Sequence, residues 1–204
     1  MTVATEVRRR GGPTKGEQRE AAILAATREL LDTRSVNDLT IDEIAKAAGV
    51  SRTSFYFYFP TKQAVVAALL DGLWDEFGGT YAWFDSIGPD RAGLREHHDA
   101  VARVWRDNRA TLTCTTGLMD YEPLADWADR AHQRFVEGLL TKIARDRADG
   151  FVSPGVDDMP LAEMIAELRN IRFRELSALE GDAYEQALDD FTEVVLRMIY
   201  GSIS

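Results

Sequence analysis

The sequence predicts an all-α protein with a small N-terminal helix-turn-helix domain followed by a larger helical domain. Apolar residues recur at spacings of three and four along most of the 204 residues, which is the periodicity of amphipathic helices. No segment shows the alternation of apolar and polar residues between hairpin turns that indicates strands. Glycines, prolines and capping residues separate the periodic segments, as expected at the ends of helices.

Composition limits the classes to which the chain can belong. An apolar share of 45% suits a globular core, and no apolar run is long enough to cross a membrane. The single cysteine excludes an internal disulfide and favours a cytoplasmic location. Residues 1–70 contain ten lysines and arginines against eight acidic residues, whereas the remainder contains 14 against 26. Only the N-terminal end is therefore expected to approach a polyanion.

Residues 1–16 are predicted to form a flexible basic arm that contains three consecutive arginines. Contact with DNA phosphates or the minor groove and a solvated tail without a role are both compatible with it. The next segment, Glu17–Asp32, is predicted to be a helix because its apolar residues share one face. We expect this helix to pack across the following pair as the third member of a small bundle.

The next stretch has the pattern of two short helices joined by a tight turn. Thr40 and Glu43 form a capping-box pattern at the start of the first helix. Gly49 stands where a left-handed residue is needed to end it, because glycine takes a positive φ without a Cβ penalty. Ser51 can cap the second helix. Pro60 ends that helix, since the residue before a proline avoids the α region.

The second helix begins with side chains that suit a recognition helix in the DNA major groove. Arg52 offers two parallel donors to guanine O6 and N7, and the hydroxyls of Thr53 and Ser54 can serve bases or phosphates. Two tyrosines and a lysine further along are expected to contact phosphate oxygens. The predicted DNA-binding residues are Thr40, Ser51, Arg52, Thr53, Ser54, Tyr56, Tyr58 and Lys62.

The run from Leu39 to Leu70 resembles the DNA-binding domain of TetR-family repressors. The shared pattern consists of Gly49-Val50-Ser51, Phe55-Tyr56, Tyr58-Phe59 and Lys62. Within the family it is most similar to the subgroup that represses the ethionamide-activating monooxygenase. The resemblance implies a homodimer that binds double-stranded, near-palindromic operator DNA and responds to a hydrophobic small-molecule effector. It divides the chain into the arm at 1–16, a DNA-binding domain at 17–62 and a ligand-binding and dimerisation domain at 63–204. Alternatively, a helical hairpin with a glycine turn can be a core element without contact to nucleic acid.

The larger domain is predicted to be a series of helices separated by glycine or proline. The first is long and carries an apolar stripe, with Gly78 and Gly79 able to bend or fray it. Asp182 is expected to cap the last helix. The predicted ranges are 61–84, 91–108, 109–119, 123–150, 160–180 and 182–200.

A mostly apolar ligand pocket is predicted from the aromatic residues of these helices. By the resemblance, Trp105, Glu167 and Asn170 align with pocket residues of the ethionamide subgroup, where Glu167 replaces an asparagine. A carboxylate there predicts a cationic or hydrogen-bond-donating ligand, unless Glu167 faces solvent. The predicted pocket residues are Trp74, Phe77, Trp105, Met119, Trp127, Glu167, Asn170 and Phe173.

The last two helices have apolar faces wider than one neighbour needs, which predicts either a four-helix dimer interface or a fuller core within one chain. An enzyme is a weaker hypothesis. His97, His98 and His132 match no metal-binding or catalytic motif, and we expect them to be solvated or to cap helices. Cys114 is expected to be a buried, inert thiol. No cofactor or metal is predicted, and a ligand-independent DNA-binding protein is disfavoured by the acidic C-terminal part.

Overall fold

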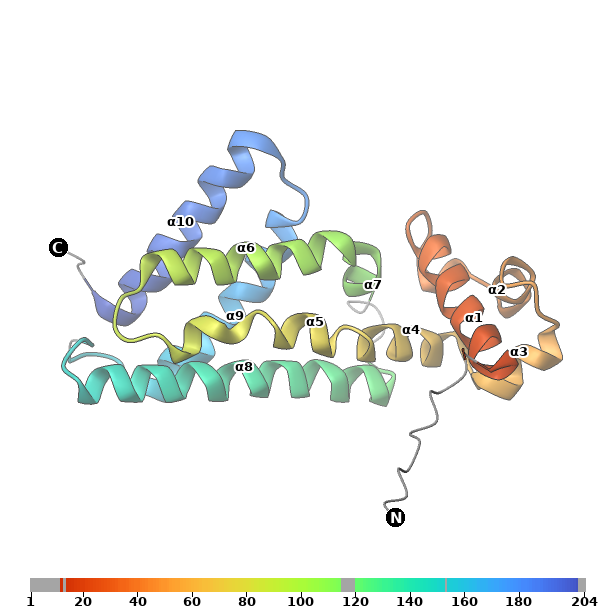
Figure 1. Cartoon of the computed structure of the whole chain (residues 1–204), viewed down its shortest axis with the longest axis horizontal. Helices are drawn as coiled ribbons and strands as arrows, with labels where there is room; N and C mark the ends of the chain where they lie inside the picture. Colours follow the sequence, from red (N-terminus) through yellow and green to blue (C-terminus); the bar gives the residue numbers. More distant parts are fainter. Residues whose placement is uncertain (1–11, 13, 115–119, 153, 202–204) are drawn as a thin grey trace, which may run out of the picture. The chain divides into compact units, whose positions relative to one another are not determined.

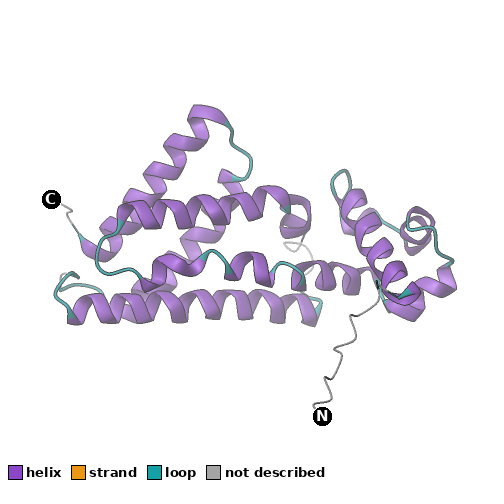
Figure 2. Cartoon of the chain, viewed as in Figure 1, coloured by secondary structure: helices purple, strands orange, loops and turns teal. Residues whose placement is uncertain are grey.

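The computed structural model describes residues 12, 14–114, 120–152 and 154–201. Every regular element in these ranges is a helix, and Figure 2 shows helices joined by loops without a strand in the part of the chain that is described. The predicted all-α fold class is therefore confirmed. The chain separates into two compact units, residues 1–66 and 67–204.

The first unit contains α1, the 3-10 helix η1, α2 and α3, and it includes the start of α4 (Figure 1). Thr14 and Glu17 form a capping box, and α1 begins at Lys15, two residues earlier than predicted. The last two residues of the predicted arm therefore belong to α1, and residues 1–11 and 13 lie outside the described residues. Thr40 and Glu43 form the predicted capping box before α2. The bounds are Lys15–Leu31 for α1, Val36–Asp38 for η1, Ile41–Ala47 for α2, Arg52–Tyr58 for α3 and Lys62–Asp71 for α4.

The core of the first unit is formed by apolar side chains from each of its helices. Ile23 of α1, Ile44 of α2 and Phe55 of α3 are fully buried. α1 packs on α2, and α2 packs on α3. Complete burial of one such side chain contributes about 1.5–3 kcal/mol relative to exposure. These contacts fix the orientation of α3, so that its remaining faces point outward.

The long helix predicted for residues 61–84 is wrong. α4 ends at Asp71, and Gly72 and Leu73 form a turn before α5 begins at Trp74. α5 then ends at Gly78, where the predicted fraying at the paired glycines does occur, and η2 follows. After proline, glycine is the least favourable residue in the interior of a helix. The prediction did not take into account that Gly72 interrupts the apolar stripe.

The second unit contains α5 to α10. α8 packs on α9, α6 packs on both α9 and α10, and η2 contacts α6 and α8, an arrangement visible in Figure 1. The last five predicted helices agree with α6 to α10 within a few residues. The helix predicted for residues 109–119 corresponds to α7, and its predicted end lies outside the described residues. The bounds are Trp74–Gly78 for α5, Tyr81–Asp85 for η2, Arg91–Asp107 for α6, Arg109–Cys114 for α7, Glu122–Ala148 for α8, Asp158–Leu176 for α9 and Gly181–Tyr200 for α10.

A buried polar network holds the loop before α6 against α8 and α10. The Asp146 carboxylate accepts hydrogen bonds from the Tyr200 hydroxyl at 2.6 Å and the Gly88 amide at 3.2 Å, and it pairs with the Lys142 ammonium at 2.9 Å. Lys142 also donates to the carbonyl of Ser86. Both side chains of the ion pair are fully buried. Buried charges are tolerated because each is paired and hydrogen-bonded.

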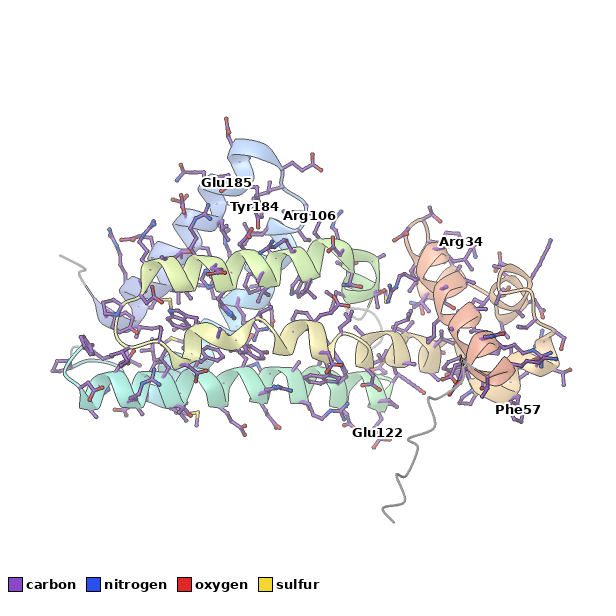
Figure 3. The ribbon with its side chains drawn as sticks, viewed as in Figure 1. Arg34, Phe57, Arg106, Glu122, Tyr184 and Glu185 are labelled. Carbon is purple, nitrogen blue, oxygen red and sulfur yellow. The ribbon has the colours of Figure 1, made fainter. Side chains whose placement is uncertain are left out.

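α10 begins one residue earlier than predicted, at Gly181, whose φ is +58°. Asp182 therefore lies in the first turn instead of capping the helix. Further along α10, the Arg106 guanidinium of α6 lies 4.5 Å from the centre of the Tyr184 ring, and Figure 3 shows these two side chains between the two helices. Arg95 of α6 pairs with Asp189 of α10 at 2.6 Å. None of the helices in the described residues is sufficiently long and apolar to span a membrane.

Candidate nucleic-acid interface and ligand cavity

The turn between α2 and α3 sets the direction in which the recognition residues point. Gly49 has a φ of +67°, as its position predicted. The Val50 amide donates to the Ala45 carbonyl at 2.9 Å, which closes the end of α2. Ser51 then caps α3 by accepting a hydrogen bond from the Ser54 amide at 3.1 Å. Local hydrogen bonds therefore build the turn, and the cap uses one lone pair of Ser51.

Arg52 lies on the surface at the start of α3, with 58% of its side chain exposed. Its guanidinium pairs with Asp42 of α2 at 2.6 Å and lies 5.7 Å from the centre of the Tyr56 ring. An exposed pair of this kind is worth about 1 kcal/mol or less. The pair thus orients the guanidinium at small cost, and a base or phosphate can replace Asp42 as its partner.

The neighbouring predicted residues share the same surface. Thr53 is exposed and Tyr56 is 46% exposed, whereas Ser54 and Tyr58 are half-buried. A shallow groove lies on this surface, and both hydroxyl-bearing and aromatic side chains line it. Hydroxyl and phenol groups on such a surface can donate to phosphate oxygens or base edges. The groove residues are Arg19, Ser51, Thr53, Ser54, Phe57 and Tyr58.

Phe57 was not predicted as a site residue, yet 83% of it is exposed and it projects from α3 in Figure 3. A signal was present in the sequence, because Phe55 points into the core and a residue two positions later lies about 200° further around a helix. An exposed aromatic side chain among hydroxyls suits contact with a thymine methyl group. Arg19 of α1 was missed as well.

Lys62 and Thr40 both have structural partners. The Lys62 ammonium donates to the backbone carbonyls of Asn37 at 2.9 Å and Leu39 at 2.7 Å, where η1 ends. The Thr40 hydroxyl is engaged with Glu43 in the capping box. Two of the three ammonium donors of Lys62 are thus occupied, which leaves one for the predicted phosphate contact. That prediction did not consider that η1 would present free carbonyls to Lys62.

The second unit contains a cavity of about 310 Å³. This volume is at the lower end of the range for small-molecule sites, about 300–1,000 Å³. Five predicted pocket residues, Trp74, Phe77, Trp105, Trp127 and Asn170, line it. The lining residues that were not predicted are Tyr81, Leu112, Ala128, Ala131, His132, Arg169 and Arg174.

Three predicted pocket residues are not part of this cavity as described. Glu167 is exposed, because it shares the outer face of α9 with Met164 and Ile171, three positions before and four after it. Phe173 is buried but lines a separate, much smaller cavity beside Phe191. Met119 lies outside the described residues. The expectation of a cation-binding carboxylate in the cavity wall therefore loses its basis.

The two adjacent histidines are buried, which corrects the prediction that they are solvated or cap helices. His97 bonds to the Thr80 carbonyl at 2.6 Å, and His98 bonds to the Thr192 hydroxyl at 3.1 Å and stacks on Phe191. Burial lowers the pKa of His97 to about 4 and lowers that of His98 as well. Both rings are therefore neutral near pH 7 and act as parts of the core.

His132 and Cys114 are two further residues whose types can take part in catalysis or metal binding. His132 is half-buried and bonds to Glu163 at 2.7 Å. Cys114 is half-buried, and not buried as predicted. This partial burial raises the pKa of its thiol to about 11, so that it is a poor nucleophile. No group of three or more potential metal ligands occurs among the residues that the structure describes.

Comparison with known proteins agrees with this geometry. Residues 23–69 match the profile of bacterial regulatory proteins of the tetR family. The transcriptional regulator EthR of Mycolicibacterium smegmatis is 29% identical over 219 aligned positions, which cover 100% of this chain and 98% of that protein. EthR of Mycobacterium tuberculosis is 51% identical over 63 positions, which cover 31% of this chain and 29% of that protein.

Solved structures share the fold. NalD, the secondary repressor of the MexAB-OprM multidrug efflux pump in Pseudomonas aeruginosa, superposes with a TM-score of 0.68 and 22% identity over 92% of this chain and 98% of that one. GusR of Salmonella enterica has a TM-score of 0.68 and 19% identity over 93% of this chain and 98% of that one. At these identities the likeness establishes the fold alone.

Proposed function

Because the chain belongs to the TetR family of bacterial transcriptional regulators and resembles EthR along its whole length, we propose that it is a ligand-released repressor. It is a DNA-binding regulator and not an enzyme, and regulators of this family act as dimers. The proposal adds that a hydrophobic small molecule binds the cavity and weakens binding to a near-palindromic operator.

The observation that supports effector control is the position of the cavity along the chain. Two residues of its wall, Trp74 and Phe77, belong to α5, which follows α4 after a turn of two residues. α4 contributes residues to both compact units, since the division falls between Val66 and Ala67. A ligand that shifts α5 therefore acts on the helix that continues into the DNA-binding unit.

Reading of DNA is assigned to the surface formed by Arg52, Thr53, Tyr56 and Phe57. The first turn of α3 presents the guanidinium and the Thr53 hydroxyl to a base edge, while Phe55 anchors the helix in the core. One such helix contacts only a few base pairs, so that two copies are needed for a specific site. In a dimer the two recognition helices would occupy half-sites about 34–36 Å apart.

The dimer is proposed to form through α9 and α10. Three large apolar side chains on these helices remain exposed, Met164 at 46%, Ile171 at 57% and Val194 at 45%. Phe173 and Phe191, on the inward sides, complete the core of the chain itself. The outer faces are thus left over after the core is built, which favours the dimer interpretation. An isologous pairing would cover both stripes.

Ligand and DNA would then weaken each other by the same factor, because coupling between binding sites is reciprocal. Only a ligand with different affinities for the two conformations can shift the balance between them. In the conformation favoured by the ligand, the distance between the two recognition helices would no longer match one turn of the DNA double helix.

The test uses fluorescence anisotropy with duplexes from the DNA upstream of the chain's own gene. We expect Arg52→Ala to weaken specific binding by about 1–3 kcal/mol and to relax base choice at one position of each half-site. Arg34→Ala is the matched control, because it removes a comparable exposed pair, to Glu43 at 2.9 Å, and lies away from Phe57 in Figure 3.

Unchanged selectivity of Arg52→Ala would remove Arg52 as the reading residue. If no upstream duplex binds the protein at low salt, the repressor assignment itself fails. If operator binding is specific but no hydrophobic compound alters it, the protein is a DNA-binding regulator without an effector.

A further inference from the structure

One residue of the cavity wall is unusual for an apolar binding site. Arg169 of α9 is 92% buried, since its exposed fraction is 8%, and its guanidinium carbon lies 3.9 Å from the centre of the Phe135 ring. No carboxylate lies within 4.0 Å of it among the described residues, and its Nε has no hydrogen-bond partner there. The Tyr81 hydroxyl is the polar group that interacts favourably with its charge.

Burial lowers the pKa of Arg169, but a guanidinium is not deprotonated in proteins, so that the side chain keeps its charge. An unpaired charge away from water is costly unless an opposite charge or a set of hydrogen bonds compensates it. Elsewhere in this unit the rule is followed, as in the Lys142–Asp146 pair. At Arg169 the described protein supplies the Tyr81 hydroxyl but no carboxylate, and the residue lines the cavity.

The permanent charges of the cavity wall are all positive. Arg169 and Arg174 line the cavity together with the ionisable residues Tyr81 and His132, and no described aspartate or glutamate lines it. Residues 71–204 nevertheless contain 26 acidic residues against 14 lysines and arginines. A wall drawn at random from so acidic a segment would contain carboxylates. The cavity is therefore locally electropositive within an acidic unit.

A second donor points to the same kind of ligand. The indole Nε1 of Trp127 is buried and lacks a hydrogen-bond partner in the described residues, although an indole N–H is normally bonded when buried. Trp127 lines the cavity and its ring centre lies 5.5 Å from that of Trp74. Two residues of the wall thus carry buried N–H groups without a partner in the described residues, and the wall also has aromatic faces for an apolar body.

We propose that the cavity binds an amphipathic organic anion, a small monocarboxylate with an aryl or alkyl body, whose carboxylate pairs with Arg169. This inference rests on the proposed function, because it names the chemical class of that effector. A charge-assisted pair with a planar guanidinium is favoured in a water-poor site. The volume of about 310 Å³ favours a compact molecule over a large nucleotide-containing one.

The first experiment compares three probes of similar size on the wild-type protein without DNA: 4-phenylbutyrate, 4-phenylbutan-1-ol and 4-phenylbutylamine. Calorimetric titration at pH 7 should give a dissociation constant for the carboxylate at least tenfold lower than that for the alcohol, with the amine weakest. Quenching of tryptophan fluorescence gives a second readout, since Trp74, Trp105 and Trp127 line the cavity.

The second experiment assigns the preference to one residue. Arg169→Met should weaken binding of the carboxylate at least tenfold while changing that of the alcohol by less than threefold. Arg172→Met is the matched control, because Arg172 lies on the same helix, outside the cavity lining, and pairs with Glu175 at 2.6 Å. It should leave all three affinities within twofold. If Arg169→Met fails to fold by circular dichroism, the wild-type series still decides the question.

The inference is overturned if the carboxylate binds no more tightly than the alcohol, or shows no saturable binding at millimolar concentration. It is also overturned if Arg169→Met weakens both ligands equally. Failure of the proposed function looks different. In that case 4-phenylbutyrate binds through Arg169, but the affinity of the protein for its operator stays the same.

Discussion

The surface of α3 takes its shape from residues close together in the sequence, whereas the cavity takes its shape from elements spread between α5 and α9. The residues proposed to read DNA lie within one helix, which is held by the Gly49 turn and the Ser51 cap. The cavity joins Trp74 to Arg174, with contributions from η2, α6, α7 and α8 between them. The first site can form as soon as its helices form, and the second requires the whole unit to fold.

The two regions also treat charge differently. Arg52 and Asp42 form an ion pair with more than half of each side chain exposed, so that water screens it and exchange of partners is easy. Lys142 and Asp146 are fully buried and locked into a network. Arg169 combines burial with the lack of a carboxylate partner in the described residues. An exposed charge is available for a large polyanion, and a buried one is selective for what fits beside it.

The largest effect that tests this contrast is expected from breaking the buried pair. Asp146→Asn should lower the free energy of unfolding by about 3–5 kcal/mol, because it leaves the Lys142 ammonium buried without its counter-charge. Asp42→Asn, which removes the exposed partner of Arg52, should cost less than about 1 kcal/mol. Urea denaturation measures both. Equal costs would show that the two ion pairs do not differ as burial implies.

A smaller effect is expected from acid. His97 has a pKa of about 4 in the folded chain and an ordinary value of 6.5, so the unfolded chain binds more protons between these pH values. Its contribution to stability is complete above about pH 6.5 and is lost as the pH falls toward 4, by roughly 3 kcal/mol. His97→Gln should flatten the pH dependence of urea denaturation in this window. The residues around α3 contain no histidine, and substitutions there should leave the slope unchanged.

The smallest effect concerns Lys62. Lys62→Met removes two hydrogen bonds to the carbonyls at the end of η1 and should cost about 1–2 kcal/mol of stability. Lys46→Met, at an exposed site on α2, is the control and should change stability by less than about 0.5 kcal/mol. If Lys62→Met leaves stability unchanged but reduces the salt dependence of DNA binding, the lysine acts mainly on phosphate.

The sequence determined the first unit almost completely by itself. Its capping boxes, the glycine turn and the apolar periodicity act over three or four residues, so that reading the chain in order predicted α1, α2 and α3 and the exposure of Arg52. Of the residues missed there, Phe57 lies on the same face of α3 as Thr53 and Ser54, whereas Arg19 belongs to α1, for which no site residue was predicted. The break at Gly72 and the role of Lys62 were missed because each depends on what the chain does elsewhere.

The tertiary structure decided which side chains face the cavity and which charges are buried. Periodicity shows that one face of α9 is apolar, but it cannot show which neighbour covers that face, so Phe173 was placed in the pocket and Arg169 was not. Glu167 was placed there by the family resemblance, which did not show that this position faces solvent here. The same limit applied to His97 and His98, whose burial follows from the packing of α6 on α9 and α10. Local hydrogen bonds are written in the spacing of residues, whereas burial depends on contacts between segments far apart in the chain.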